Sequence, residues 1–110
     1  MIQGVKSMED ALTDSTYLIM LALLRPQHGY AIMKEVSELT KGTVEIGPAS
    51  MYTILKKLQK NHYIVLEETT DRKKIYSITD LGKEILKKDI QRRKLFFEAG
   101  EQLLAEGGNA

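Results

Sequence analysis

Three observations in the 110-residue sequence predict a mainly helical α+β fold. First, three successive segments between residues 13 and 60 carry apolar residues at helical spacing. Second, two short runs rich in β-branched residues follow at residues 64–66 and 75–78, with a polar turn between them. Third, a longer segment with helical spacing closes the chain. We expect one domain with one core, because 110 residues that are 43% hydrophobic fit a single small domain.

The first two expected helices are separated by a short break. Residues 13–16 all offer N-cap side chains, and the nearly all-apolar segment that follows them indicates a helix buried on several sides. Pro26 and Gly29 mark the break. Beyond it, Ile32, Val36 and Leu39 stand at positions i, i+4 and i+7, which predicts an amphipathic helix of about three turns.

The third expected helix lies in the stretch GPASMYTILKKLQK. Pro48 suits its first turn, where the missing N–H has no helical partner to lose. Met51, Leu55 and Leu58 repeat at i, i+4 and i+7, so one face of the helix is expected to be buried. The helix follows the second helix across a short connection that contains glycines, which is the order of a helix-turn-helix motif.

A β-hairpin and a final helix complete the expected elements. The runs at residues 64–66 and 75–78 are expected to pair, with residues 69–72 at the tip of the hairpin. Thr79 or Asp80 can cap a helix of about 25 residues that ends at the glycines of positions 107 and 108. A hairpin directly behind a helix-turn-helix is the wing of a winged helix. We therefore expect a winged helix-turn-helix domain with its N-terminal helix at residues 1–80, and a C-terminal helix and tail at residues 81–110.

Composition argues against several classes of protein. Without cysteine, the chain has no disulfide, no Cys-based zinc site and no Cys nucleophile, which fits a reducing cytosol. The N-terminus lacks the apolar region of a signal peptide, and the longest apolar run is eight residues, whereas a membrane span needs about 20. His28 and His62 have no clustered carboxylates beside them. We expect a cytoplasmic protein with no membrane partner, no catalytic residues, no metal site and no cofactor.

Charge is distributed unevenly along the chain. Residues 48–94 carry twelve Lys or Arg and six Asp or Glu, whereas the remainder carries four basic and nine acidic residues. On the third helix, the side opposite the apolar face holds a threonine and three lysines, with a serine and a tyrosine at its edges. Such side chains suit contacts with base edges and phosphates, and the free N–H groups of the first turn suit a phosphate. The candidate DNA contacts on this helix are Pro48, Ala49, Ser50, Tyr52, Thr53, Lys56, Lys57 and Lys60.

The wing adds a second basic feature, the sequence DRKK at residues 71–74. Two basic features on neighbouring elements favour binding of double-stranded DNA. The alternative is a winged helix that serves as a protein–protein adaptor and does not bind DNA. An adaptor would tend to place apolar or acidic residues on the outward face of the third helix, where this chain places lysines.

The last helix has two apolar lines that lie well apart around its axis. One line holds Leu86, Ile90, Phe97 and Leu104, and the other holds Leu81, Ile85, Phe96 and Leu103. A small domain can cover one line, so the second predicts a symmetric dimer. We assign the first line to the dimer surface and add Tyr17 of the first helix. A homodimer would also present two recognition helices to the two halves of a palindromic site. One broad face on a single core remains the alternative.

Three short motifs resemble those of the PadR family of winged-helix transcriptional regulators. They are HGY at residues 28–30, SMY at the start of the third helix and YSITDLG at residues 76–82, within a resemblance that covers roughly residues 16–86. The short C-terminal part, which consists of one helix only, is similar to that of the smaller subfamily. The wing, TTDRKK, is shorter than the glycine-rich tip that is common in the family.

The resemblance implies a homodimeric repressor of a palindromic operator that a small aromatic or drug-like effector can release. It implies DNA contacts from Ser50, Tyr52 and Lys56, a place near a phosphate for Tyr30, and wing contacts from Arg72, Lys73 and Lys74. Members that bind flat drugs carry a Trp on the last helix, and this chain aligns Arg93 there. The candidate effector contacts are therefore Arg93, Phe96 and Phe97.

Overall fold

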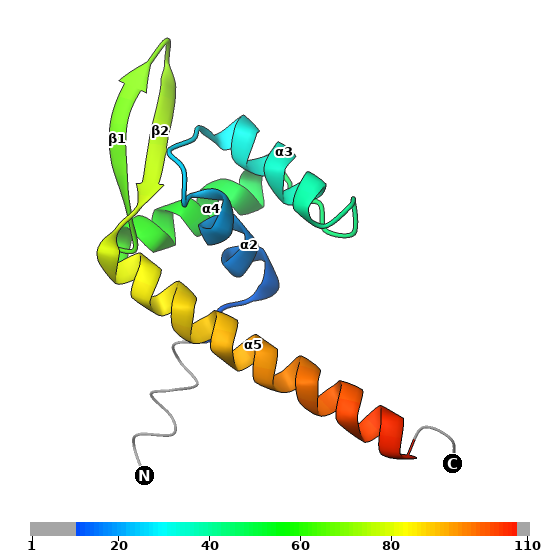
Figure 1. Cartoon of the computed structure of the whole chain (residues 1–110). Coiled ribbons are helices and arrows are strands. Elements are labelled where there is room, and N and C mark those ends of the chain that lie inside the picture. Colours follow the sequence, from blue (N-terminus) through cyan, green and yellow to red (C-terminus); the bar gives the residue numbers. More distant parts are fainter. Residues whose placement is uncertain (1–10, 108–110) are drawn as a thin grey trace.

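The computed structural model describes residues 11–107. Residues 1–10 and 108–110, which begin the expected first domain and end the expected tail, lie outside the described residues. The elements are α2 (Asp14–Ala22), α3 (Gly29–Leu39), α4 (Pro48–Lys60), β1 (Ile64–Thr70), β2 (Lys73–Ile78) and α5 (Asp80–Gly107). Figure 1 shows α2, α3 and α4 gathered together, the hairpin of β1 and β2 standing beside them, and α5 running away from the group. The predicted mainly helical fold with a winged helix-turn-helix and a long last helix is confirmed.

The core lies where α2, α3 and α4 meet the base of the hairpin and the first turns of α5. The expected apolar faces of α3 and α4 are buried, but Leu39 at the end of α3 is 51% exposed, so its predicted place on the buried face is wrong. Burial of each large aliphatic side chain contributes about 1.5–3 kcal/mol relative to exposure. The fully or nearly fully buried core side chains include Ile19, Met20, Leu23, Ile32, Val36, Met51, Leu55, Leu58 and Ile64.

Local sequence explains where the helices begin and end. The Thr13 hydroxyl accepts a hydrogen bond from the Thr16 N–H and caps α2. Pro48 stands in the first turn of α4, as expected. At the other end of α4, His62 adopts a left-handed conformation with φ 64°, and the next N–H, that of Tyr63, bonds to the Leu58 carbonyl. These contacts form a Schellman motif, which turns the chain sharply into β1.

The wing is longer than the sequence indicated. Its strands pair antiparallel from Ile64↔Ile78 out to Thr70↔Lys73, with a bulge between Leu66 and Glu68. Only two residues form the tip, Asp71 and Arg72, and both have the positive φ that a type I′ hairpin turn needs. The expected four-residue tip was wrong because Thr69 and Thr70 continue β1 and pair with Lys74 and Lys73. Lys73 and Lys74 therefore lie on β2, next to the tip.

Two glycines allow the elements to approach closely. A Cβ at Gly29 would lie 2.7 Å from Cε of Met51 and 3.0 Å from the Tyr52 hydroxyl, so α3 packs directly on α4. A Cβ at Gly82 would lie within van der Waals radii of the Tyr63 carbonyl oxygen, so α5 begins against the start of β1. These contacts give a physical reason for the glycines of the HGY and YSITDLG motifs.

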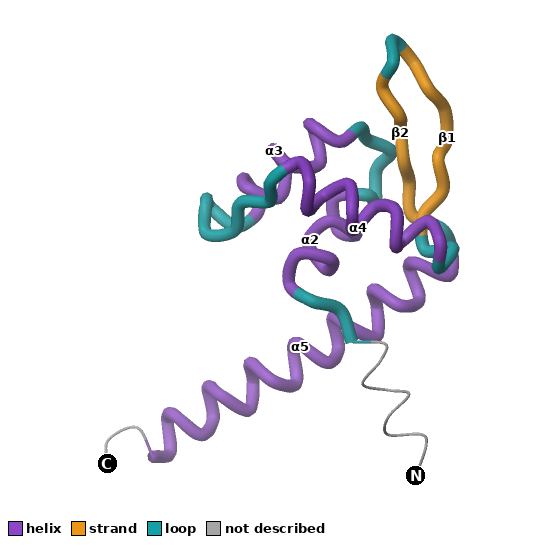
Figure 2. The backbone as a smooth tube through the Cα atoms, turned by 180° about the vertical axis from the view of Figure 1, so that it is seen from behind, coloured by secondary structure: helices purple, strands orange, loops and turns teal. Residues whose placement is uncertain are grey.

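The helix α5 has a docked half and a projecting half. Ile85 and Leu86 belong to the core, and Asp89 is buried, whereas every residue from 94 to 107 is exposed. The two views of Figures 1 and 2 show α5 extending far beyond α2. The Cα radius of gyration is 16.2 Å, against about 13 Å for a compact domain of about 100 residues. The buried apolar residues of α5 therefore lie in its docked half and most of the exposed ones in its projecting half, although Leu81 in the first turn, which was expected to share the line of Ile85, is 49% exposed. Within residues 11–107, no helix is long and apolar enough to cross a membrane.

Candidate nucleic-acid interface

The outward face of α4 is polar, basic and free of carboxylates. Lys56, Lys57 and Lys60 are exposed, α4 contains no acidic residue, and no ion pair holds these lysines among residues 11–107. Tyr52 is 55% exposed at one edge of this face. Pro48, Ala49, Ser50 and Thr53 are exposed as well, and the Thr53 hydroxyl donates to the Ala49 carbonyl one turn earlier. All eight candidate contacts on α4 are therefore accessible to a partner.

A hollow of about 500 Å³ separates α4 from the wing. Tyr52 enters it from α4, while the wing contributes the basic residues of its tip and of β2. The start of α3 forms the third wall with the residues of the HGY motif. The structure thus brings together five candidate DNA contacts from three separate elements, namely Tyr30, Tyr52, Arg72, Lys73 and Lys74.

The start of α3 lines this hollow with residues 28–30. Its cap residue, His28, makes no side-chain hydrogen bond to the helix, and the first turn holds no acidic residue. The first N–H groups of a helix lack helical partners and attract anions. Tyr30 is 70% exposed beside them. This wall of the hollow suits an oxygen-rich, negatively charged group.

A buried tyrosine forms the floor of the hollow. Tyr76 is only 5% exposed, and its backbone pairs with Gln27 in an isolated bridge that ties the wing to the segment before α3. Burial, together with the neighbouring Tyr52, raises the pKa of the Tyr76 side chain above its ordinary value. The Tyr76 hydroxyl therefore keeps its proton and remains a hydrogen-bond donor at neutral pH.

Not every candidate on α4 faces the hollow. Lys57 lies on the opposite edge of the helix, where it lines a separate small recess with Thr16 and Ile54. Lys56 and Lys60 fall between the two edges. The outward face therefore has a side next to the wing, marked by Tyr52, and a side next to α2, marked by Lys57.

The dimer candidates fall into three different environments. Phe97 and Leu104 are 57% and 72% exposed on the projecting half of α5, and Ile90 is 37% exposed where that half begins. Leu86 is only 3% exposed because it packs in the core of its own chain, so a partner cannot use it as a free surface residue. Tyr17 is partly buried, and the Arg93 guanidinium lies 4.1 Å from its ring centroid.

The effector candidates line an open hollow of about 610 Å³ between α5 and the start of α2. Arg93 is already engaged there: its guanidinium donates to the carboxylates of Asp89 and Asp14 and to the Leu12 carbonyl. Phe96 and Phe97 are more than half exposed. Arg93 is thus held by its own chain, whereas the two phenyl rings are accessible, and effector binding at these three residues stays a prediction.

Sequence reasoning missed Asp89 and its ion pairs with Arg92 and Arg93. Asp89 falls on the buried side of α5, four residues after Ile85 and three after Leu86, and two arginines follow it within the next turn. A carboxylate at an apolar position, with cations at i+3 and i+4, was the available signal. Its bond to the Leu12 N–H joins residues 77 positions apart, which no local pattern shows.

Known proteins resemble this chain in both sequence and structure. The model of the transcriptional regulator PadR-like family matches residues 18–88. A protein of Lysinibacillus sphaericus, described only as uncharacterized protein X, is 32% identical over 73 residues, which are 63% of this chain and 67% of that protein. A transcriptional regulator from Clostridium thermocellum is 25% identical, with a TM-score of 0.67 over 81% of this chain and 90% of the other. A PadR family transcriptional regulator from Eggerthella lenta, 19% identical, shares the fold with a TM-score of 0.70 over 93% and 86% of the two chains.

Proposed function

The chain belongs to the PadR-like family of transcriptional regulators, which are not enzymes, and we propose that it represses transcription as a homodimer bound to a palindromic operator. Transcriptional regulators generally act on DNA, so double-stranded DNA is the proposed partner. The proposal includes sequence-specific recognition by α4 and backbone contacts from the wing and the start of α3.

The observation that carries this proposal is the hollow between α4, the wing and α3. Tyr52, the wing cations and the first residues of α3 line one space of about 500 Å³, and the His28 side chain does not cap α3. Within residues 11–107, Arg72, Lys73 and Lys74 form no ion pair. Unpaired cations beside hydroxyl donors match the phosphate contacts that orient a protein on a duplex.

Base recognition is assigned to the outward face of α4. The helix is amphipathic, so its buried side anchors it to the core while the opposite side remains free to enter a major groove. Ser50, Tyr52 and Thr53 carry hydroxyls that can reach base edges or phosphates, and Lys56 and Lys60 supply charge. An outward face with three lysines and no carboxylate favours DNA over the protein partner of an adaptor, which would tend to meet apolar or acidic residues there.

Dimerisation is assigned to the projecting half of α5. A solvent-exposed helix with five large apolar side chains, all at least 56% exposed, would be unfavourable in a monomer. A second copy of the same helix offers a matching apolar surface. The residues of this apolar surface are Leu95, Phe96, Phe97, Leu103 and Leu104.

The test is fluorescence anisotropy with a labelled duplex from the region upstream of the protein's own gene. A scrambled duplex of the same composition is the control, and both are titrated over a range of salt concentrations. We expect a preference of about a thousandfold for the upstream duplex, with affinity that falls as salt rises. If a library of random duplexes also yields no preferred site, the proposed operator recognition is wrong.

A further inference from the structure

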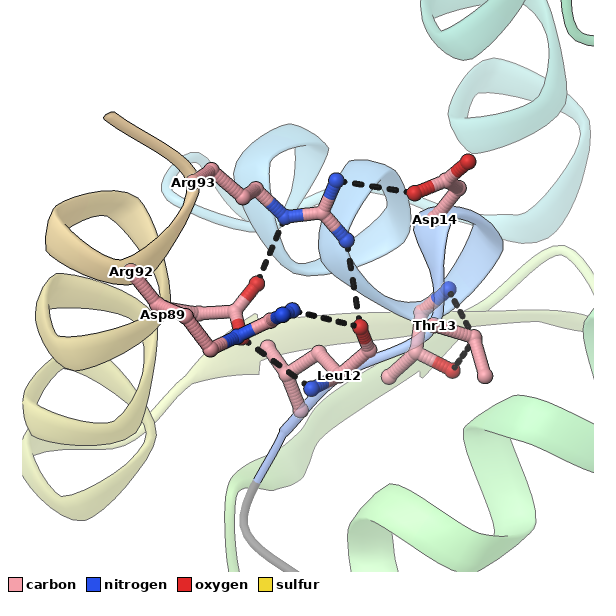
Figure 3. Close-up of polar contacts among 7 residues, drawn as sticks. Leu12, Thr13, Asp14, Asp89, Arg92 and Arg93 are labelled. Atoms are coloured by element: carbon pink, nitrogen blue, oxygen red, sulfur yellow. Dashed lines mark hydrogen bonds and ion pairs between the residues drawn. The ribbon is translucent and has the colours of Figure 1, made fainter. Parts of the chain in front are cut away.

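A cluster of ion pairs joins α5 to the segment before α2, as Figure 3 shows. Asp89 of α5 accepts hydrogen bonds from Nε of Arg92 at 3.0 Å and from Nε of Arg93 at 2.7 Å. Both guanidinium groups also donate to the Leu12 carbonyl, at 3.3 and 3.1 Å. Arg93 reaches further, to the Asp14 carboxylate at 2.8 Å. We call these five residues, Leu12, Asp14, Asp89, Arg92 and Arg93, the brace.

Asp89 is the central group of the brace. Its side chain is 1% exposed, and the Leu12 N–H donates to it at 3.1 Å, so three donors from two parts of the chain converge on one buried carboxylate. Burial alone would raise its pKa, but the hydrogen bonds from Arg93, Leu12 and Arg92 outweigh burial and lower it. The carboxylate is therefore charged at neutral pH and holds two cations that would otherwise repel each other.

The brace lies where α5 leaves the domain. Ile85 and Leu86 make the apolar contacts of α5 one turn earlier, and from residue 94 onward every described side chain is exposed. The Arg93 guanidinium also lies over the Tyr17 ring of α2. The brace is thus the last set of contacts between α5 and the winged helix before the projecting half begins.

We propose that Asp89 is a positioning residue that, through Arg92 and Arg93, fixes the angle between α5 and the winged helix, and thereby the operator spacing that the dimer accepts. The spacing part rests on the proposed function. Charge-assisted bonds with defined directions suit this role better than apolar packing, because a fork of N–H donors fixes orientation as well as distance.

The geometry makes this angle important. From residue 94 to residue 107, α5 continues for about 21 Å at 1.5 Å per residue, so a tilt of about 10° at the brace moves its end by about 4 Å. If two α5 helices pair through their projecting halves, the same tilt displaces the two winged helices relative to each other. Half-sites one turn apart are about 34 Å from centre to centre, so displacements of this size change which spacing fits.

The first test measures the angle within one chain. Because the chain has no cysteine, spin labels can be placed at Lys41→Cys, after α3, and at Glu101→Cys, on the projecting half of α5. Both sites are exposed. Doubly labelled protein is mixed with a large excess of unlabelled protein. Pulsed electron–electron double resonance then measures the distance between the two labels of one chain. The variant is Asp89→Asn, which keeps the size of the side chain and removes the charge.

We expect one narrow distance distribution for the parent and a shifted or at least twofold broader one for Asp89→Asn. Glu84→Gln is the matched control, because it removes one carboxylate charge from the same helix at an exposed ion pair with Lys87. Its distribution should equal that of the parent. A folded Asp89→Asn protein with an unchanged distribution would show that the brace does not set the angle, even if its melting temperature fell.

Arg93→Lys provides a second variant in case Asp89→Asn does not fold. Lysine retains the positive charge, but it lacks the planar guanidinium whose N–H groups donate to Asp89, Asp14 and the Leu12 carbonyl at the same time. We expect the distance distribution to broaden here too, but by less than in Asp89→Asn. A parent-like distribution in Arg93→Lys would overturn the orienting role of the arginine and, with it, the proposal.

The second test measures spacing with the upstream duplex that the parent prefers. Its centre is lengthened or shortened by one and two base pairs. We expect the parent to lose affinity steeply with each change, and Asp89→Asn to discriminate at least threefold less, while Glu84→Gln follows the parent. Equal discrimination by Asp89→Asn would refute the spacing role. If the parent binds no duplex, the proposed function fails, and the distance measurement still decides whether the brace fixes the angle.

Discussion

The two surfaces that this small domain leaves uncovered differ in chemistry. The surface formed by α4, the wing and the start of α3 carries lysines, an arginine and hydroxyls, with polar groups turned outward and apolar groups in the core. The projecting half of α5 exposes leucines and phenylalanines instead. The first surface suits a negatively charged partner, and the second suits an apolar partner surface.

The difference indicates two kinds of partner for one chain. Cations without carboxylate neighbours gain most from a polyanion, since binding releases counterions from it. Exposed apolar side chains gain most from removal of water, at about 25 cal/mol for each Å² buried. The brace joins α5, which would hold the partner copy, to the start of α2, and so to the domain whose α4 and wing would hold DNA.

The largest expected effect comes from a charge on the apolar surface. In Phe97→Glu, a carboxylate would have to be buried between two α5 helices, so we expect a monomer by sedimentation velocity. Operator affinity should then fall by about a hundredfold or more, because linked binding to two half-sites is lost. The control, Gln91→Glu, adds the same charge at an exposed polar position of α5 and should remain dimeric. A dimeric Phe97→Glu protein would place the dimer surface elsewhere.

The next effect concerns the junction where α5 begins. In Gly82→Ala, the new methyl group would overlap the Tyr63 carbonyl oxygen, a backbone atom that cannot move freely. We expect the free energy of unfolding in urea to fall by about 1–3 kcal/mol. Gly29→Ala is the comparison, because its nearest atoms are the flexible ends of Met51 and Tyr52. Its loss should be smaller, and an equal loss would contradict this explanation.

A third variant removes the tyrosine at the edge of the hollow. Because Tyr52 is 55% exposed, Tyr52→Ala should keep its melting temperature while its preference for the operator, or its affinity, falls about tenfold or more. Leu39→Ala, at a side chain that is 51% exposed on α3, is the matched control and should bind like the parent. A collapse of the melting curve in Tyr52→Ala would mean that the residue stabilises the fold.

The smallest effect is expected for one lysine of the basic surface. Lys56→Ala should weaken binding to every duplex by a similar factor, and the slope of log affinity against log salt should shrink by about one. Lys34→Ala removes the same charge from α3, where Lys34 lines a different hollow with Glu35 and Glu38. It should leave the slope unchanged. An unchanged slope in Lys56→Ala would remove that residue from the proposed contacts.

Much of this fold could be predicted from local sequence, because helices and their ends depend on neighbours a few residues apart. The spacing of Met51, Leu55 and Leu58 correctly indicated the buried face of α4, and Thr13 was among the predicted caps of α2. Local sequence therefore correctly predicted which segments form helices and which form strands. The length of the wing was not predicted, because the pairs Thr69↔Lys74 and Thr70↔Lys73 form between polar side chains that show no apolar alternation along the sequence.

The residues of the candidate site could be predicted from the sequence, but their arrangement in space could not. Charge and motif resemblance selected Tyr30, Tyr52 and the wing cations, whereas their meeting around one hollow required the packing of α3 on α4. The structure also separated residues that the sequence grouped together. Leu86 and Phe97 share one line of α5, but one is in the core and the other is exposed, because the domain covers only the first turns of that helix.

The sequence by itself determined the order of the elements, the basic face of α4 and the apolar character of α5, since these follow from composition and periodicity along the chain. Only the tertiary structure decided that α5 leaves the domain at Arg93 and that Asp89 is buried there. The physical reason is distance along the chain. Leu12 and Asp14 lie more than 70 residues from the α5 side chains that they bind, so folding alone brings them together.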